Sequence, residues 1–229
     1  MPCIRKKLPV AGSVDGLEDT VTKPVEGVSE RILSCAKEEF LEKGYSEASL
    51  RTIAAKAGTT TGSIYSRFKD KEGLFSTIVE PVAEDIVNMF RKIQNDFHEE
   101  DPQMQPKLMN QYVSDGMDEM LDYIYEHFEE FQLLLDASYG TKFQDFVESL
   151  VEIETESTYQ FMNTIQYQSE DREVVTEEFI HIMTRALFES MFEVVRHKMT
   201  KEKARKYMHM LERYHYGGWN SIFQFDKQK

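Results

Sequence analysis

The sequence has few of the features that mark secreted, membrane-spanning or β-rich proteins. Its two cysteines, Cys3 and Cys35, are too few for a disulfide framework, which favours a reducing, cytoplasmic compartment. No run approaches the ~18 apolar residues of a membrane span, and no apolar segment follows the basic N-terminus as in a secretory signal. Strand-like alternation and turn dipeptides are also scarce. These absences predict an all-α, cytoplasmic protein that does not enter a membrane.

The negative charge is concentrated in one part of the chain. The formal net charge is -14, yet residues 27–75 sum to +1 and residues 76–229 to -15. A near-neutral segment can present a local basic face to phosphate, while an acidic remainder is repelled by it. The overall acidity therefore does not exclude a partner such as DNA.

Residues 29–75, which we call the head, contain the pattern of three short helices and the start of a fourth. Apolar residues recur at spacings of three and four. Gly44 and Gly58 are placed to end the first two helices, and Ser49 and Thr60 to cap the second and third. Residues 1–28 lack such periodicity, and we expect them to form a flexible arm.

Residues 76–229, which we call the body, are predicted to be entirely helical. Asp70 is placed to cap a long fourth helix that joins head and body, and Pro81 predicts a kink or a split in it near Glu80. Further helical patterns cover approximately 107–136, 141–167, 174–199 and 201–224.

The stretch AAKAGTTTGSIYSRFKDKEGLF (54–75) has the properties of a helix-turn-helix. Ala54 is small where the two helices would cross, and Ile64 and Phe68 would anchor the second helix in the core. The remaining residues of that helix are polar and would face outward into a major groove. Phosphate contacts would come from its edges. The outward residues are Thr61, Ser63, Ser66 and Arg67, and the edge residues are Ser49, Tyr65 and Lys71.

Residues 31–75 resemble the DNA-binding domain of TetR-type (tetracycline-repressor-like) transcriptional regulators. The matching motifs are IL-x2-A-x3-F-x3-GY at 32–45, S-x3-IA-x2-AG at 49–58 and T-x-GSIY-x2-F-x-DKE-x-LF at 60–75. Two positions depart from the family pattern. Ala48 replaces a common threonine, and Gly73 replaces a better helix former, which we expect to loosen the first turn of the fourth helix.

The resemblance implies a ligand-responsive repressor that binds double-stranded operator DNA as a homodimer. Its two heads would enter successive major grooves of a pseudo-palindromic operator, ~34–36 Å apart or a multiple of it. Tyr65 and Lys71 then correspond to phosphate contacts, and Arg51 to an exposed position that often reaches DNA. The implied DNA-binding residues are Ser49, Arg51, Thr60, Thr61, Gly62, Ser63, Tyr65, Ser66, Arg67 and Lys71.

The resemblance also implies an effector pocket and a dimer interface in the body. The pocket would take a largely apolar small molecule, and its candidate polar residues are Tyr112, His127, Tyr139, Tyr159 and Arg185. The interface would be a four-helix arrangement with two-fold symmetry. Its candidate residues are Phe179, Met183, Leu187, Met191, Met208, Leu211, Gly218 and Ile222.

Several alternatives remain open at this point. The apolar stripes could pack within one subunit, and Tyr65 could be a core aromatic. A helical adaptor that binds proteins without reading DNA is a second functional class. Glu178 with His181, and Glu212 with His215, match the Glu-x-x-His pairs of di-iron bundles. Because the first pair lies opposite the apolar stripe, we expect no metal, no cofactor and no enzyme activity.

Overall fold

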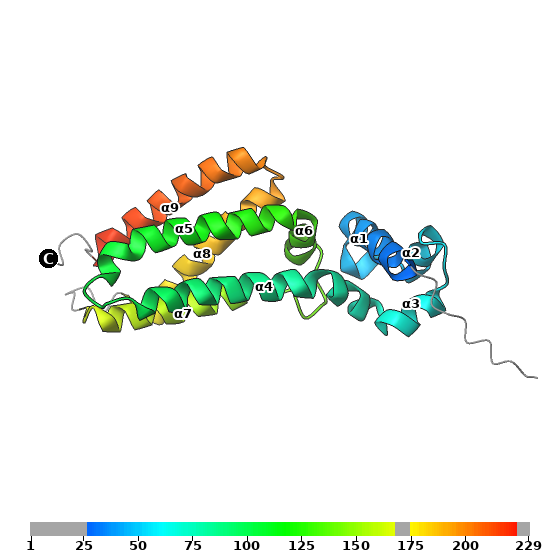
Figure 1. Cartoon of the computed structure of the whole chain (residues 1–229), viewed down its shortest axis with the longest axis horizontal. Helices are drawn as coiled ribbons and strands as arrows, with labels where there is room; N and C mark the ends of the chain where they lie inside the picture. Colours follow the sequence, from blue (N-terminus) through cyan, green and yellow to red (C-terminus); the bar gives the residue numbers. More distant parts are fainter. Residues whose placement is uncertain (1–26, 168–174, 224–229) are drawn as a thin grey trace, which may run out of the picture.

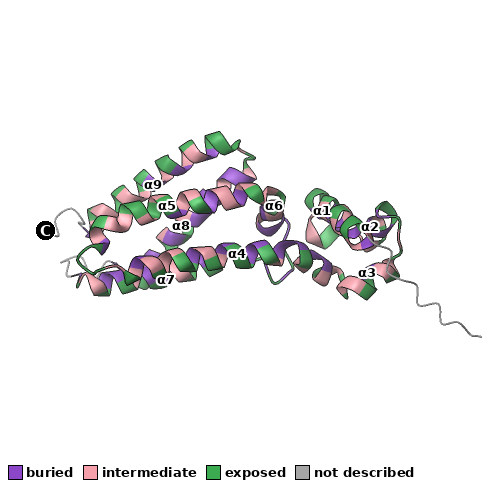
Figure 2. Cartoon of the chain, in the orientation of Figure 1, coloured by how far each residue is buried: buried purple, intermediate pink, exposed green. Residues whose placement is uncertain are grey.

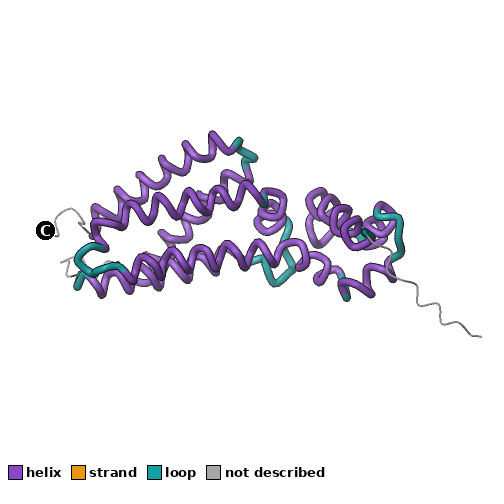
Figure 3. Tube along the Cα trace, in the orientation of Figure 1, coloured by secondary structure: helices purple, strands orange, loops and turns teal. Residues whose placement is uncertain are grey.

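The structure is a computed structural model that describes residues 27–167 and 175–223. Within these ranges the chain consists of α-helices and connecting loops, without a strand (Figure 3). Of the predicted arm, only Gly27 and Val28 fall inside the described residues. The helices are α1 (Val28–Glu47), α2 (Leu50–Lys56), α3 (Thr61–Phe68), α4 (Lys71–Glu99), α5 (Gln105–Glu126), α6 (Phe128–Asp136), α7 (Phe146–Thr164), α8 (Glu177–Arg196) and α9 (Lys201–Phe223).

The molecule is elongated, with the three short helices at one end (Figure 1). Helices α1, α2 and α3 form the head together with the first turns of α4, and α4 continues along the body (Figure 1). The all-α fold with an N-terminal helix-turn-helix head is therefore confirmed. None of the helices in the described ranges combines the length and apolar character that crossing a bilayer requires.

The head is held together by the apolar spacing of α1 and by one buried carboxylate. Ile32, Ala36 and Phe40 are fully buried at intervals of four residues. Between them lies Glu39, whose side chain is inaccessible to solvent. Its oxygens lie 3.1 Å from Lys43 Nζ and 3.2 Å from Lys56 Nζ, so that it links α1 to α2. Burial opposes ionisation, but the hydrogen bonds from these two lysines lower the pKa of Glu39.

The helix ends in the head follow the sequence signals. At Gly44 the backbone leaves helical geometry with φ 71° and ψ 167°, although the helix continues to Glu47. The hydroxyl of Ser49 accepts from Thr52 N at 3.5 Å, and that of Thr60 accepts from Ser63 N at 3.2 Å. The predicted N-caps of α2 and α3 are thus confirmed.

The turn between α3 and α4 requires a glycine. Asp70 caps α4 by accepting from Gly73 N at 2.7 Å. A Cβ on Gly73 would lie 2.0 Å from the carbonyl oxygen of Phe68, which is far inside contact distance. The sequence suggested that Gly73 only loosens this turn. The structure shows instead that glycine permits the close approach of the two helices.

Pro81 does not split α4, which is one helix of 29 residues from Lys71 to Glu99. The missing N–H of Pro81 would have bonded to the carbonyl of Thr77, and both residues are exposed. Water can therefore satisfy that carbonyl, while the flanking Ile78 and Val82 remain buried.

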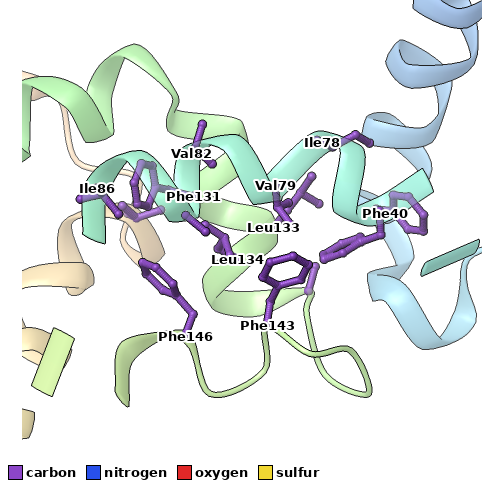
Figure 4. Close-up of a cluster of buried hydrophobic side chains, with 14 of the residues drawn as sticks. Phe40, Ile78, Val79, Val82, Ile86, Phe131, Leu133, Leu134, Phe143 and Phe146 are labelled. Carbon is purple, nitrogen blue, oxygen red and sulfur yellow. The ribbon is translucent and has the colours of Figure 1, made fainter. Parts of the chain in front are cut away.

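Head and body meet in an apolar cluster around α4 (Figure 4). The rings of Phe40 and Phe75 lie 5.1 Å apart, edge to face, and Phe75 also faces Phe143 at 6.2 Å. Polar contacts reinforce the junction. Tyr45 N donates to the carbonyl oxygen of Ala137 at 2.9 Å, so that the end of α1 is tied to the end of α6.

The body departs from the predicted helix pattern in two places and agrees with it elsewhere. The helix predicted over 107–136 is two helices, α5 and α6, which meet at His127 with φ -122° and ψ 39°. This break turns the buried residues of α6 toward α1 and α4, which a straight helix could not do. Helix α7 also begins later than predicted, at Phe146. Burial follows the inward faces of the bundle, while α9 is largely exposed (Figure 2).

Candidate nucleic-acid interface and internal cavity

The outward face of α3 is a polar surface at the end of the molecule distant from α9 (Figure 1). Ile64 is fully buried and fixes the rotation of the helix. As a result Gly62, Tyr65 and Ser66 are exposed, and Thr61 is half-buried at the first turn. The exposed fraction of Tyr65 is 54%, which excludes the alternative that it is a core aromatic within this chain.

Two residues of this face are hydrogen-bonded to each other. Arg67 Nη1 donates to Ser63 Oγ at 2.6 Å and to the Ser63 carbonyl at 3.2 Å. Ser66 Oγ donates to the same carbonyl at 3.0 Å. Arg67 therefore lies back along α3 in this structure. It would have to release Ser63 before either side chain could reach a base or a phosphate.

The flanks of α3 carry polar and basic groups on α2 and on the start of α4. Arg51 and Thr60 are exposed, and Ser49 uses its hydroxyl to cap α2. Lys71 Nζ donates to the carbonyl of Ser46 at 2.9 Å and lies 4.7 Å from the centre of the Tyr45 ring. Burial lowers the pKa of Lys71. These contacts hold its ammonium group at the N-terminus of α4, beside α3.

Lys69 was missed by the sequence reasoning. It is exposed at the C-terminal end of α3 and has a φ of 70°, which a lysine rarely adopts. The turn into α4 imposes this conformation and directs the residue away from the core. The sequence signal that could have identified Lys69 is its position between Phe68, which anchors α3, and Asp70, which caps α4.

The body encloses a mostly apolar cavity of about 140 Å³. Its wall is formed by aromatic rings, methionines and other apolar side chains, with few polar groups. The apolar and aromatic lining residues are Phe90, Ile93, Phe97, Met109, Tyr112, Val113, Gly116, Met117, Met120, Phe161, Leu187, Phe188, Met191, Tyr216, Trp219 and Phe223. The polar ones are Gln94, Glu154, Ser157, Thr158, Glu212 and His215.

A chain of hydrogen bonds ends at the cavity wall. Gln94 Nε2 donates to Glu154 Oε2 at 2.8 Å, and Ser157 Oγ donates to Gln94 Oε1 at 2.5 Å. Ser157 must then accept from His98 Nε2 at 2.8 Å, which places the imidazole proton on Nε2. Burial lowers the pKa of His98 and raises that of Glu154 to about 7.

Comparison with known proteins agrees with this geometry. Residues 32–78 match the family model described as bacterial regulatory proteins, tetR family. The chain is 44% identical over 50 residues to the HTH-type transcriptional repressor BepR of Brucella suis biovar 1 (strain 1330). It is 49% identical over 51 residues to the HTH-type transcriptional regulator AcrR of Shigella flexneri. Each alignment spans 22% of this chain and only 24% of the relative.

The fold of the whole body is also shared with known structures. A TetR-like transcriptional regulator from Rhodococcus sp. RHA1 superimposes with a TM-score of 0.54, covering 87% of this chain and 98% of its own. The identity is 17%, so this likeness concerns the fold alone. Residues 32–78 therefore match the tetR family, and most of the chain shares the fold of a TetR-like regulator.

Only one of the five candidate pocket residues lines the cavity, namely Tyr112. His127 packs against the ring of Tyr123, tilted to it, at the break between α5 and α6. Tyr139 is 80% exposed in the loop that faces the head. Tyr159 is half-buried against the apolar cluster that contains the cavity residues Phe97 and Phe161, without lining the cavity itself. Arg185 is paired with a carboxylate of α7.

The carboxylates of the cavity were missed because candidate residues were chosen by type rather than by position. Glu154 follows Leu150 and Val151 on the buried stripe of α7, and Glu212 follows Met208 on that of α9. A carboxylate at an apolar stripe position was the signal that could have found both.

The candidate dimer residues divide between the interior and the surface. Met191 and Met208 are each 2% exposed and pack inside the subunit, so they have no surface left for a partner. Leu187 lines the cavity. Phe179, Met183, Leu211 and Ile222 are half-buried, and only Gly218 is exposed. The stripes thus serve mainly the subunit's own core.

A different face of α8 and α9 exposes large apolar side chains. Ile182 is 57% exposed on α8, and Met210 and Tyr214 are 63% and 77% exposed on α9. On α9 these two side chains share one helical face with Gly217 and Gly218. A Cβ at either glycine would meet nothing within 4 Å.

The di-iron alternative has no support in the geometry. Glu178 is exposed, and His181 lies 3.3 Å from Glu148 on the outer side of α8. Glu212 and His215 do share the cavity wall. Within the described part of the chain, no three His, Cys, Asp or Glu side chains are grouped so as to hold a metal ion.

Proposed function

We propose that this chain is a transcriptional repressor that binds operator DNA as a homodimer and releases it when a small molecule occupies the body cavity. The observation that carries the proposal is the exposed polar face of α3, held by the buried Ile64 in a head that matches the family model. The relative BepR is a transcriptional repressor, which supports the same function for this chain. DNA binding is assigned to residues 29–75, and ligand binding and dimerisation to residues 76–229.

In this proposal the residues of α3 read bases and its flanks contact phosphates. Thr61, Ser63 and Ser66 face outward from the first turns, which is where a recognition helix meets base edges. The exposed hydroxyl of Tyr65 and the fixed ammonium of Lys71 suit phosphate oxygens. Arg67 would also contact a phosphate once its hydrogen bonds to Ser63 are broken.

We place the dimer interface on the exposed face of α8 and α9 rather than on their buried stripes. Ile182, Met210 and Tyr214 supply apolar area, and the open surface at Gly217 and Gly218 lets a second helix approach closely. A two-fold axis through this face would leave both heads free for DNA.

The ligand response would travel through α4. Phe90, Ile93 and Phe97 of this helix line the cavity, and Lys71 at its other end lies at the proposed DNA face. The 29 residues of α4 span about 43 Å as one continuous helix. Only a ligand that prefers the non-DNA geometry releases the operator, and a coupling of ~1–3 kcal/mol changes operator affinity about 5- to 150-fold.

The proposal is tested by selecting duplexes from a random library with the full chain and measuring their binding by fluorescence anisotropy. We expect a palindromic selected site, a dimer in sedimentation, and affinity that falls steeply with salt. Tyr65→Phe should weaken all duplexes alike, whereas Ser63→Ala should change the preferred sequence. A protein adaptor without DNA binding would show no salt-dependent affinity for any duplex.

A matched control is Tyr139→Phe, which removes the same atom from an exposed tyrosine in the loop between α6 and α7. It should leave duplex affinity per dimer unchanged. If Tyr65→Phe behaves like this control, the phosphate contact assigned to Tyr65 is wrong.

A further inference from the structure

Two carboxylates face the cavity from different helices. Glu154 comes from α7 and Glu212 from α9, where Glu212 is 9% exposed. Glu154 accepts from Gln94 at 2.8 Å, and Glu212 accepts from Ser114 Oγ at 3.3 Å. In the described part of the chain no lysine or arginine forms an ion pair with either of them. The partner of Glu212 that can become charged is His209, 3.6 Å away.

Carboxylates in such a setting favour a positively charged occupant. Removing a carboxylate from water is unfavourable unless a cation or hydrogen bonds compensate it. Phe97, Phe161 and Trp219 are among the aromatic residues of the wall, and the faces of such rings attract an organic cation but not an anion. The methionines of the wall can adapt to its shape.

An acidic groove lies next to the cavity, between α4 and α5. It has a volume of about 580 Å³, and Asp96, Glu100, Asp115 and Glu119 are among its lining residues. Its one basic lining residue, Lys92, lies 2.6 Å from Asp96 Oδ2 and is thus already paired. Such a groove raises the local concentration of cations and lowers that of anions.

Groove and cavity share part of one wall. Ile93, Tyr112 and Gly116 line both. A Cβ on Gly116 would lie 3.2 Å from Ile93 Cγ2, so the two helices approach closely there. Tyr112 Oη donates to Glu100 Oε1 at 2.8 Å on the groove side, while its ring packs against Phe97 on the cavity side. The acidic groove thus leads directly to the apolar wall.

The volume limits the size of the occupant. A cavity of about 140 Å³ is close to the ~150 Å³ apolar cavity that accommodates benzene in another protein. It therefore holds one aromatic ring as it stands, and the adaptable methionines of the wall must move to admit an attached ammonium group as well. We propose that the cavity binds a single-ring aromatic ammonium ion, which reaches it through the acidic groove and is held by Glu154 and Glu212. Its biological meaning rests on the proposed ligand response, but binding itself needs no DNA.

Trp219 allows a direct test, because the chain has one tryptophan and it lines the cavity. The probe is benzyltrimethylammonium, titrated into the full chain while Trp219 fluorescence is recorded. Its uncharged isostere, neopentylbenzene, has the same shape. We expect a saturable change with the cation and an affinity at least about tenfold weaker for the isostere, corresponding to ~1.4 kcal/mol. Equal or tighter binding of the isostere, or of the anion phenylacetate, would overturn the proposal.

Charge-neutral variants locate the contact. Glu154→Gln and Glu212→Gln should each weaken the cation about tenfold and leave neopentylbenzene unchanged. Glu152→Gln, on the exposed face of α7, is the matched control and should change neither. If both cavity variants bind the cation as the control does, the carboxylates do not hold it and the proposal is wrong.

The route is tested by stopped-flow mixing. Asp115→Asn combined with Glu119→Gln should slow association of the cation and reduce its salt dependence, with dissociation unchanged. The exposed pair Glu152→Gln and Glu156→Gln is the control. An association rate equal to the control's would refute the groove as the route. Operator release is measured separately, so that bound cation without release contradicts only the proposed function, and operator binding without cation binding contradicts only this inference.

Discussion

Replacing Glu154 by glutamine should change how the stability of the body depends on pH. Burial raises the pKa of Glu154 from 4.5 to about 7, so between these values the folded chain binds a proton that the unfolded chain has lost. Stability contributed by this group therefore falls as pH rises from about 4.5 to about 7 and is constant above. A shift of about 2.5 units corresponds to at most ~3.4 kcal/mol, and partial exposure of the side chain reduces this to roughly 2–3 kcal/mol.

The surroundings of Glu154 allow the variant to isolate this effect. On α4, Gln94 donates to Glu154, and a glutamine oxygen at position 154 can accept the same bond. His98, further along the same chain of hydrogen bonds, has a pKa lowered by burial. On α8, Arg185 and His181 are paired with Glu148. The difference between the wild type and Glu154→Gln therefore reports mainly the carboxyl group itself.

The assay is urea unfolding followed through Trp219, from about pH 5.5 to about pH 8.5. Glu154→Gln should be more stable than the wild type by roughly 2–3 kcal/mol at the upper end, and the difference should shrink toward the lower end. Glu152→Gln should run parallel to the wild type. Parallel curves for Glu154→Gln as well would refute the reasoning, because they would mean that Glu154 is ionised freely in the folded chain.

Three further predictions follow from particular contacts. Gly73→Ala should destabilise the chain by ~1–3 kcal/mol and weaken operator binding when unfolding and anisotropy are measured, because its Cβ would collide with Phe68 O. Gly217→Ala, in open space within the subunit, should leave the unfolding free energy of the subunit unchanged. Pro81→Ala should raise the melting temperature, because the helix is already continuous there, and should alter ligand-induced release more than operator affinity. An equal loss of ligand-induced release and of operator affinity would mean that Pro81 has only a structural role. Binding of benzyltrimethylammonium at pH 7 should release about half a proton from Glu154, seen by calorimetry in buffers of different ionisation enthalpy; no buffer dependence would contradict the contact.

The head could be predicted in detail because its signals are local. A cap such as Ser49 or Thr60 acts within three residues, and the spacing of Ile64 and Phe68 sets the rotation of a short helix. The exposure of Tyr65 follows from the same spacing. Only the role of Gly73 was misjudged, since it depends on a contact across two helices rather than on helix propensity.

The cavity could not be predicted in the same way, because its wall is assembled from helices distant in sequence. The sequence shows that α9 has an apolar stripe but not that Trp219 and Met120 face the same space. The break at His127 ends the regular spacing of buried residues that one long helix would have, and it changes the direction of the chain that follows. Polar residue types alone therefore gave one correct wall residue, Tyr112, among five.

The route by which an occupied cavity would reach the DNA face is limited by the junction. An occupant between α4 and α7 would contact Ile93 and Phe97 of α4. The head, however, is attached to the body by other contacts besides α4. Lys37 Nζ lies 2.5 Å from Glu130 Oε1, and the end of α1 is bonded to the end of α6. A displaced α4 must therefore carry α6 along or break these contacts. Packed clusters such as that around Phe75 shift between discrete arrangements rather than deform gradually. If α4 carries α6 along, the head therefore moves as a unit and its DNA-reading face is preserved.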